Sequence, residues 1–172
     1  MGLLSCVGCA IPVIEIAPDE DFSGYETWGW LPRLEASDTD LHESAELRDR
    51  IRRQVERSLA NLGYRKVTGR VPDFYVTYHL KLRSELVVRR ETPAEQNLET
   101  FQQEGSFDVT RTTTHIARYE TANLAVDVAE GQERQLVWRG RLEKRVRGSF
   151  APHVEGAVAA VLERFPPRPP RD

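Results

Sequence analysis

Residues 74–83 read FYVTYHLKLR, and this stretch decides the fold class. Apolar or aromatic side chains fill the even positions from Phe74 to Leu82, whereas the odd positions alternate with them and become polar toward Arg83. Successive side chains of a strand point to opposite faces, so the alternation predicts a half-buried strand with one face toward a core. His79 falls on the wet face of this strand, where a ligand role would need partners from elsewhere in the chain.

The segment before this strand predicts an amphipathic helix over about residues 40–62. Asp40 followed by Glu43 is typical of a helix start, and Gly63 is typical of a left-handed stop. Burial of an apolar stripe contributes on the order of 1.5 to 3 kcal/mol per side chain before the entropy cost. The stripe recurs at helical spacing and consists of Leu47, Ile51, Val55, Leu59 and Leu62.

Downstream, the chain predicts a hairpin and then a second helix. Alternation at 122–128, a turn at Glu130-Gly131 and a return through 136–142 indicate the hairpin. Pro152 is a good first helical residue, and an apolar stripe follows it as far as Phe165, which predicts a helix over about 152–165.

Two further regions complete the prediction. Residues 21–32 read DFSGYETWGWLP and predict a short aromatic strand, with Trp28 and Trp30 more plausible as core than as a ligand platform. Residues 84–118 predict two strands joined by a long exposed loop. We therefore expect an α+β fold with one largely antiparallel twisted sheet and two helices packed on one face, in a single domain over 17–167 with a short tail at 168–172.

The composition excludes some function classes. With 24 basic and 27 acidic residues, the net charge of the 172-residue chain is -3, which predicts no general attraction to nucleic acid. Arginine dominates the cations, but acidic residues lie between the arginines and no pure basic block forms.

Both cysteines lie near the start of the chain, at Cys6 and Cys9, so a disulfide within the domain is excluded. One Cys-x-x-Cys supplies only half of a zinc site, and we predict no metal and no cofactor. Residues 1–16 are largely apolar and lack basic residues, which indicates the remnant of a signal and tether whose true start lies upstream of Met1. Val7-Gly8-Cys9 has the small-residue approach to a lipidated cysteine, and Leu3-Leu4-Ser5-Cys6 is a looser alternative.

In their order along the chain, several segments resemble the bacterial lipoproteins of domain-of-unknown-function family 4136. The segments that carry this resemblance are Asp21-Phe22-Ser23-Gly24-Tyr25, Trp30-Leu31-Pro32, Val71-Pro72-Asp73-Phe74-Tyr75-Val76, Leu124-Ala125-Val126-Asp127-Val128, Leu136-Val137-Trp138-Arg139-Gly140 and Leu162-Glu163-Arg164-Phe165-Pro166-Pro167. The resemblance implies a lipoprotein of the bacterial cell envelope, anchored in the outer membrane, facing the periplasm and without assigned catalytic residues. The anchor would be Cys9, or alternatively Cys6.

No phosphate loop, nucleophile elbow or His-Glu-x-x-His motif occurs in the sequence. We therefore expect a non-enzymatic binding or structural role, in which a protein, glycan or lipid of the envelope meets the polar sheet face. The alternative is a small-ligand carrier or a hydrolase with a pocket between sheet and helices, for which Asp127 and His79 are the conceivable pair. The candidate partner-binding residues form a row of arginines, which could equally be the solvated edge of a strand: Arg139, Arg141, Arg145 and Arg147.

Overall fold

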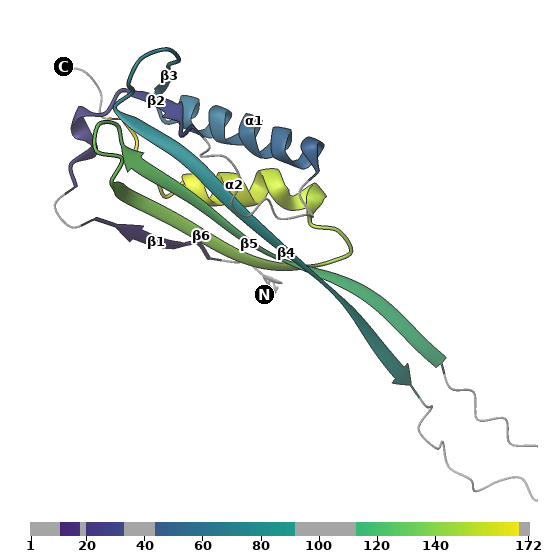
Figure 1. The fold of residues 1–172 in the computed structure, drawn as a ribbon. Coiled ribbons are helices and arrows are strands. Elements are labelled where there is room, and N and C mark those ends of the chain that lie inside the picture. Colours follow the sequence, from purple (N-terminus) through teal and green to yellow (C-terminus); the bar gives the residue numbers. More distant parts are fainter. Residues whose placement is uncertain (1–10, 18–19, 33–43, 92–112, 169–172) are drawn as a thin grey trace, which may run out of the picture.

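The structure is a computed structural model that describes residues 11–17, 20–32, 44–91 and 113–168 (Figure 1). In these residues the chain forms six strands, two α-helices and two short 3₁₀ segments. The strands are β1 (Val13–Ile16), β2 (Thr27–Trp30), β3 (Arg65–Lys66), β4 (Phe74–Glu91), β5 (Thr113–Glu130) and β6 (Leu136–Arg147). The helices are α1 (Ala45–Asn61) and α2 (Val154–Leu162), and the 3₁₀ segments are Phe22–Gly24 and Ala151–His153.

The strands form one open sheet in the order β1-β6-β5-β4-β2-β3. The three pairings on the β1 side are antiparallel, whereas β2 pairs in parallel with both β4 and β3. The prediction of a largely antiparallel sheet is therefore corrected to a mixed sheet in which most pairings are antiparallel. The reason is the crossover through α1, because a helix between two strands returns the chain to the end of the sheet where the first strand began.

The central strands β4 and β5 are longer than the sequence indicated. Each runs for 18 residues, and the register is continuous from Phe74 opposite Glu130 to Glu91 opposite Thr113. The two additional strands predicted within 84–118 are thus the far halves of β4 and β5, and the predicted loop at 92–112 lies outside the described residues. Alternation could not reveal this continuity, because the far halves have no buried face.

Helix α1 begins at Ala45, where the side chain of Ser44 accepts a hydrogen bond from the Leu47 amide at 3.2 Å. The predicted start at Asp40 and Glu43 lies outside the described residues. At the other end Gly63 has a φ of +92°, so the predicted left-handed stop is confirmed. The helix buries four of the five residues of the predicted stripe, with Ile51, Val55 and Leu59 fully inaccessible, whereas Leu62 caps the helix and is partly buried.

Both helices lie side by side on one face of the sheet (Figure 1). The predicted helix over 152–165 is shorter in the structure, because Pro152 lies in a 3₁₀ turn and α2 begins at Val154 and ends at Leu162. The predicted stripe is buried, with Val154, Val158, Val161 and Leu162 on α2 and Phe165 just beyond it. Gly140 of β6 lets this helix approach closely, because a Cβ there would lie 2.6 Å from Cγ1 of Val161. Trp28 is 1% exposed and lies in the core, as predicted, whereas Trp30 is half-buried at its margin.

Candidate functional site

The face of the sheet opposite the helices carries an ion pair at its centre. Asp127 of β5 stands directly opposite Arg139 of β6, and its two carboxylate oxygens accept hydrogen bonds from Nε at 2.6 Å and from Nη2 at 2.5 Å. His79 of β4 approaches the same carboxylate at 3.6 Å. Burial raises the pKa of Asp127, but the hydrogen bonds and charge of Arg139, with the nearby charge of His79, outweigh it and lower the pKa to about 2.

The predicted arginine row lies on this open face, but most of its members already have partners. Arg139 is held by Asp127, Arg141 lies 3.3 Å from Glu15 of β1, and Arg145 lies 2.8 Å from Glu85 of β4. The Arg145 guanidinium also stacks over the Tyr119 ring at 4.4 Å. Arg147 is exposed near the end of β6. The row therefore links β6 to β5, β1 and β4 through ion pairs, and carboxylates of the sheet neutralise most of its positive charge.

The fold brings Asp127 and His79 close together, as a hydrolase would need, but the Asp127 carboxylate is already bound by Arg139. Arg139 occupies both oxygens of Asp127 in a bidentate pair. A carboxylate that orients a catalytic histidine must offer that histidine a well-directed acceptor. The geometry of Asp127 fits an anion that fixes the register of β5 and β6.

Three hollows of the described surface lie outside the sheet–helix interface. One of about 460 Å³ lies between the outer sides of α1 and α2, one of about 620 Å³ lies beside the turn before β4, and one of about 450 Å³ adjoins Asp73 and Glu130. Between sheet and helices, fully buried aliphatic side chains such as Val55 and Val158 fill the space.

Cys6 and Cys9, the candidate lipid-attachment residues, lie outside the described residues. Within 11–17, 20–32, 44–91 and 113–168, no group of three or more histidine, cysteine, aspartate or glutamate side chains is arranged to hold a metal ion. Neither described helix has the length and apolarity that crossing a bilayer requires.

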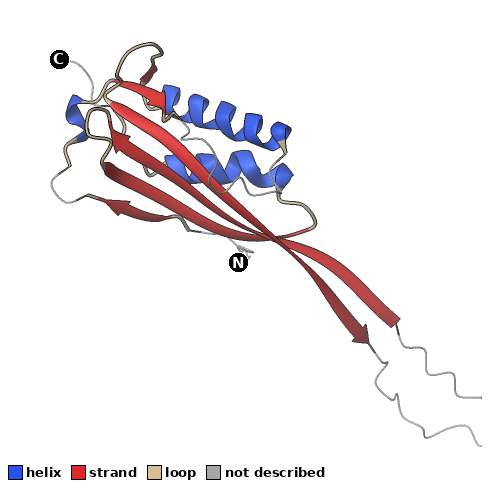
Figure 2. Cartoon of the chain, in the orientation of Figure 1, coloured by secondary structure: helices blue, strands red, loops and turns tan. Residues whose placement is uncertain are grey.

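The far halves of β4 and β5 form a two-stranded ribbon that projects from the body of the protein (Figure 2). Strand β6 ends its pairing with β5 at Tyr119, and β2 pairs with β4 only as far as Val76. Three aliphatic side chains lie exposed on the ribbon: Leu86 at 68%, Val88 at 55% and Ile116 at 66%. Val88 and Ile116 are direct cross-strand neighbours, so the ribbon presents a small apolar surface to solvent.

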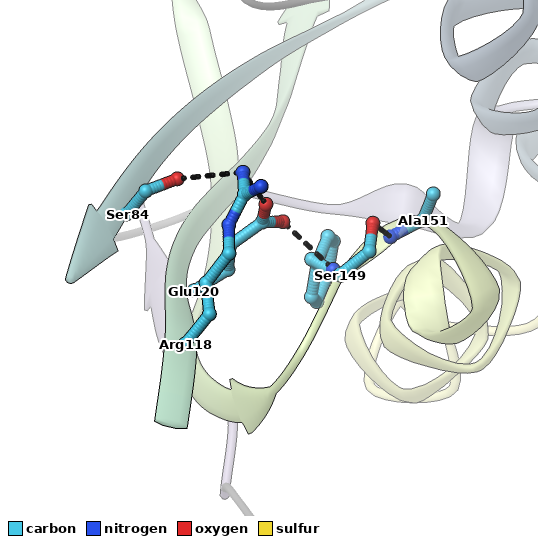
Figure 3. Close-up of polar contacts among 6 residues, drawn as sticks. Ser84, Arg118, Glu120, Ser149 and Ala151 are labelled. Atoms are coloured by element: carbon cyan, nitrogen blue, oxygen red, sulfur yellow. Dashed lines mark hydrogen bonds and ion pairs between the residues drawn. The ribbon is translucent and has the colours of Figure 1, made fainter. Parts of the chain in front are cut away.

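A buried carboxylate fixes the base of this ribbon (Figure 3). Glu120 is 8% exposed and accepts a hydrogen bond from the Phe150 amide at 2.8 Å, in the loop that leads into α2. Arg118 donates to Glu120 at 2.9 Å and reaches Ser84 of β4 at 3.3 Å. The sequence did not predict this contact, although Glu120 continues the inward-facing alternation of Ala122 and Leu124, where a carboxylate is unexpected.

The comparisons with solved structures support the fold. The chain is 10% identical to a PDZ domain protein from Parabacteroides distasonis, with a TM-score of 0.55 over 92% of this chain and 37% of that one. It is 8% identical to a PelC dodecamer from Paraburkholderia phytofirmans, with a TM-score of 0.50 over 89% of this chain and 94% of that one. The chain thus spans little more than a third of the first of these proteins. At these identities the likeness shows the fold alone.

No curated protein matches the sequence. A family model does, and it covers residues 13–167, nearly all of the described fold. This agrees with the resemblance carried by the segments from Asp21 to Pro167. The chain belongs to the family defined by the domain of unknown function DUF4136.

Proposed function

We propose that this domain is a non-enzymatic binding or structural element of the bacterial cell envelope. In this proposal a lipid on Cys9, or alternatively on Cys6, anchors it in the outer membrane, and the domain faces the periplasm. Val7-Gly8-Cys9 and the resemblance to envelope lipoproteins support the anchor. The binding role rests on one observation, the ribbon of β4 and β5 with exposed Leu86, Val88 and Ile116.

The ribbon supports binding because it is poorly stabilised by the rest of the fold. A two-stranded hairpin alone is marginally stable in water, and exposed aliphatic clusters on soluble proteins mark contact surfaces. The interior, by contrast, is filled by side chains, which favours a partner at the surface over a small ligand between sheet and helices. The similar fold of PelC, which was solved as a dodecamer, adds support for a role within an assembly.

The anchor is tested by labelling cells with palmitate and measuring incorporation into the full-length protein. We expect Cys9→Ser to abolish the label and Cys6→Ser to retain it. The lipid would be attached through the Cys9 sulfur, which serine lacks. The reverse pattern would move the anchor to Cys6. Label that survives both substitutions, or that is absent from the wild type, would refute lipid attachment.

The binding role is tested by placing a photoreactive benzoylphenylalanine at position 86 or at position 71 in cells. Val71 serves as the control, because its side chain is 64% exposed, close to the 68% of Leu86, and it lies away from the ribbon. We expect discrete crosslinked adducts on denaturing gels from position 86 and only background from position 71. Equal adducts from both positions, or none from position 86, would contradict a contact role for the ribbon.

A further inference from the structure

Strand β1 forms one end of the sheet and leaves aliphatic side chains in water. Among the described residues it pairs only with β6, and its Ile14 packs against the core, which holds the strand in place. Ile11, Val13 and Ile16, by contrast, are exposed at 76%, 62% and 52%. Exposed aliphatic side chains that gather along one edge are typical of a contact surface for another protein or for a membrane.

The position of the proposed anchor decides between these two occupants. Cys9 precedes Ile11 by two residues and Val13 by four. A fully extended chain advances at most about 3.6 Å per residue, so Ile11 lies within about 7 Å, and Val13 within about 14 Å, of a cysteine whose acyl chains enter the bilayer. An anchor at Cys6 would add no more than about 11 Å. Either anchor therefore keeps the β1 edge within reach of the membrane surface.

The charges along this edge do not oppose a phospholipid surface. Glu15, the single carboxylate of β1, lies 3.3 Å from Arg141, so this pair is neutral. Because β1 is antiparallel to β6, its N-terminal end, where the tether enters, points toward residues 142–147 of β6. These six residues carry three basic side chains and one glutamate, and one positive charge remains even after Glu85 of β4 pairs with Arg145. Basic side chains beside exposed aliphatic ones are typical of surfaces at the level of lipid headgroups.

We propose that the β1 edge lies against the phospholipid bilayer that holds the anchor, with Ile11, Val13 and Ile16 at the boundary between headgroups and acyl chains. This inference rests on the anchor proposed above and names the surface of the domain that meets the membrane. The unpaired backbone groups of β1 stay hydrated at this depth, whereas deeper insertion would leave them without partners in hydrocarbon. Strand β3 ends the sheet on the other side, so β3 and the turn at Val71 lie away from the lipid.

The test imposes the tether chemically, so that it does not depend on acylation in cells. The full chain with Cys6→Ser is coupled through the Cys9 sulfur to maleimide-bearing phospholipid in vesicles of phosphatidylethanolamine and phosphatidylglycerol, and flotation confirms the coupling. Benzoylphenylalanine is placed at position 13 in one sample and at position 71 in the other. Val71 matches Val13 in exposure, at 64% against 62%, but lies on the other side of the sheet. Mass spectrometry after irradiation measures the fraction of protein that carries a phospholipid adduct.

We expect at least about threefold more phospholipid adduct from position 13 than from position 71, because even partial burial of one aliphatic side chain shifts an equilibrium by that factor. Ile11→Glu should lower the adduct at position 13 by a similar factor, since it removes an aliphatic contact and adds a negative charge at an anionic surface. Val71→Glu makes the same change in charge away from the β1 edge and should leave the adduct at position 13 unchanged. Circular dichroism confirms that each variant is folded.

Equal adducts from positions 13 and 71, or none from position 13 in vesicles that carry the protein, would overturn the inference. An adduct at position 13 that survives Ile11→Glu would also overturn it, because the contact would then follow from tethering alone and not from the apolar edge.

These outcomes are separable from failure of the anchor. If palmitate labels Cys9 in cells but position 13 acquires no phospholipid in vesicles, the anchor stands and the edge contact is excluded. If palmitate labels neither cysteine in cells but position 13 acquires phospholipid in vesicles, the edge binds lipid when it is held there. The anchor is then excluded, and with it the proposed arrangement at the membrane.

Discussion

Gly131→Ala is expected to lower the free energy of unfolding by about 3 kcal/mol, the upper end of the range for overpacked sites. A Cβ at this position would lie 1.9 Å from the Pro72 carbonyl oxygen and 3.0 Å from that of Asp73. Both are backbone atoms, so no side-chain rotation relieves the clash. The Gly131 amide also donates to the Asp73 carbonyl at 2.9 Å, and the displaced turn would lose this bond.

The damage would spread, because Asp73 organises the neighbouring strand. One of its carboxylate oxygens accepts from the Glu26 amide at 2.9 Å, from the Thr27 amide at 2.7 Å and from the Thr27 hydroxyl at 2.8 Å. The hydrogen bonds from Glu26 and Thr27 lower the pKa of Asp73 despite the opposing effect of its burial. A shift of the Pro72-Asp73 backbone would therefore detach the start of β2 from the sheet.

Urea denaturation at neutral pH measures this effect, with Gly156→Ala as the matched control. Gly156 lies within α2, and a Cβ there would meet no atom within 4 Å. Alanine is the better helix former, so the control should gain about 0.5 to 1 kcal/mol. A loss of under about 1 kcal/mol in Gly131→Ala would show that the turn accommodates a methyl group, and would contradict the packing described here.

Local periodicity predicted the parts of the fold that bury one face of a single element. Helix α1, its stop at Gly63, the terminal helix and the near half of β4 all follow from patterns within a few residues of sequence. The parallel pairing of β2 with β4 did not follow, because pairing direction depends on how the chain crosses the sheet. The sequence also predicted the ribbon as separate strands. The exposed far halves of β4 and β5 lack the apolar alternation that marks a buried face, so their continuity with the near halves was not visible.

The candidate site shows the same limit. The sequence indicated a wet face with a row of arginines, and β6 presents Arg139, Arg141 and Arg145 there. The sequence could not indicate that each of these arginines lies beside a carboxylate. The two members of each ion pair come from different strands, so the pairs depend on the register of those strands. A one-residue slip of β6 would move Arg139 to the other face and leave Asp127 unpaired.

Asp127→Asn is expected to remove about 2 kcal/mol of stability at pH 7, with a characteristic dependence on pH. The pKa of Asp127 falls from 3.8 to about 2 in the folded protein, and its side chain is only 8% exposed. A depressed folded-state pKa means that the carboxylate stabilises the fold fully above the unfolded-state pKa. That stabilisation is lost as the pH falls through about 4 and then about 2, where the carboxylate becomes protonated in both states.

The measurement is urea denaturation of wild type and variant at a series of pH values from 7 to about 2, with stability differences compared at each pH. We expect the difference to be constant near neutrality and to shrink below about pH 4. Arg139→Gln supplies the control, because without the guanidinium Asp127→Asn should remove much less stability, which a double-mutant cycle measures directly. An unchanged difference across the acid range, or an equal effect in the Arg139→Gln background, would mean that Asp127 does not act through its pair with Arg139. In that case the Asp127–Arg139 pair on the open face would not be the contact that aligns β5 with β6.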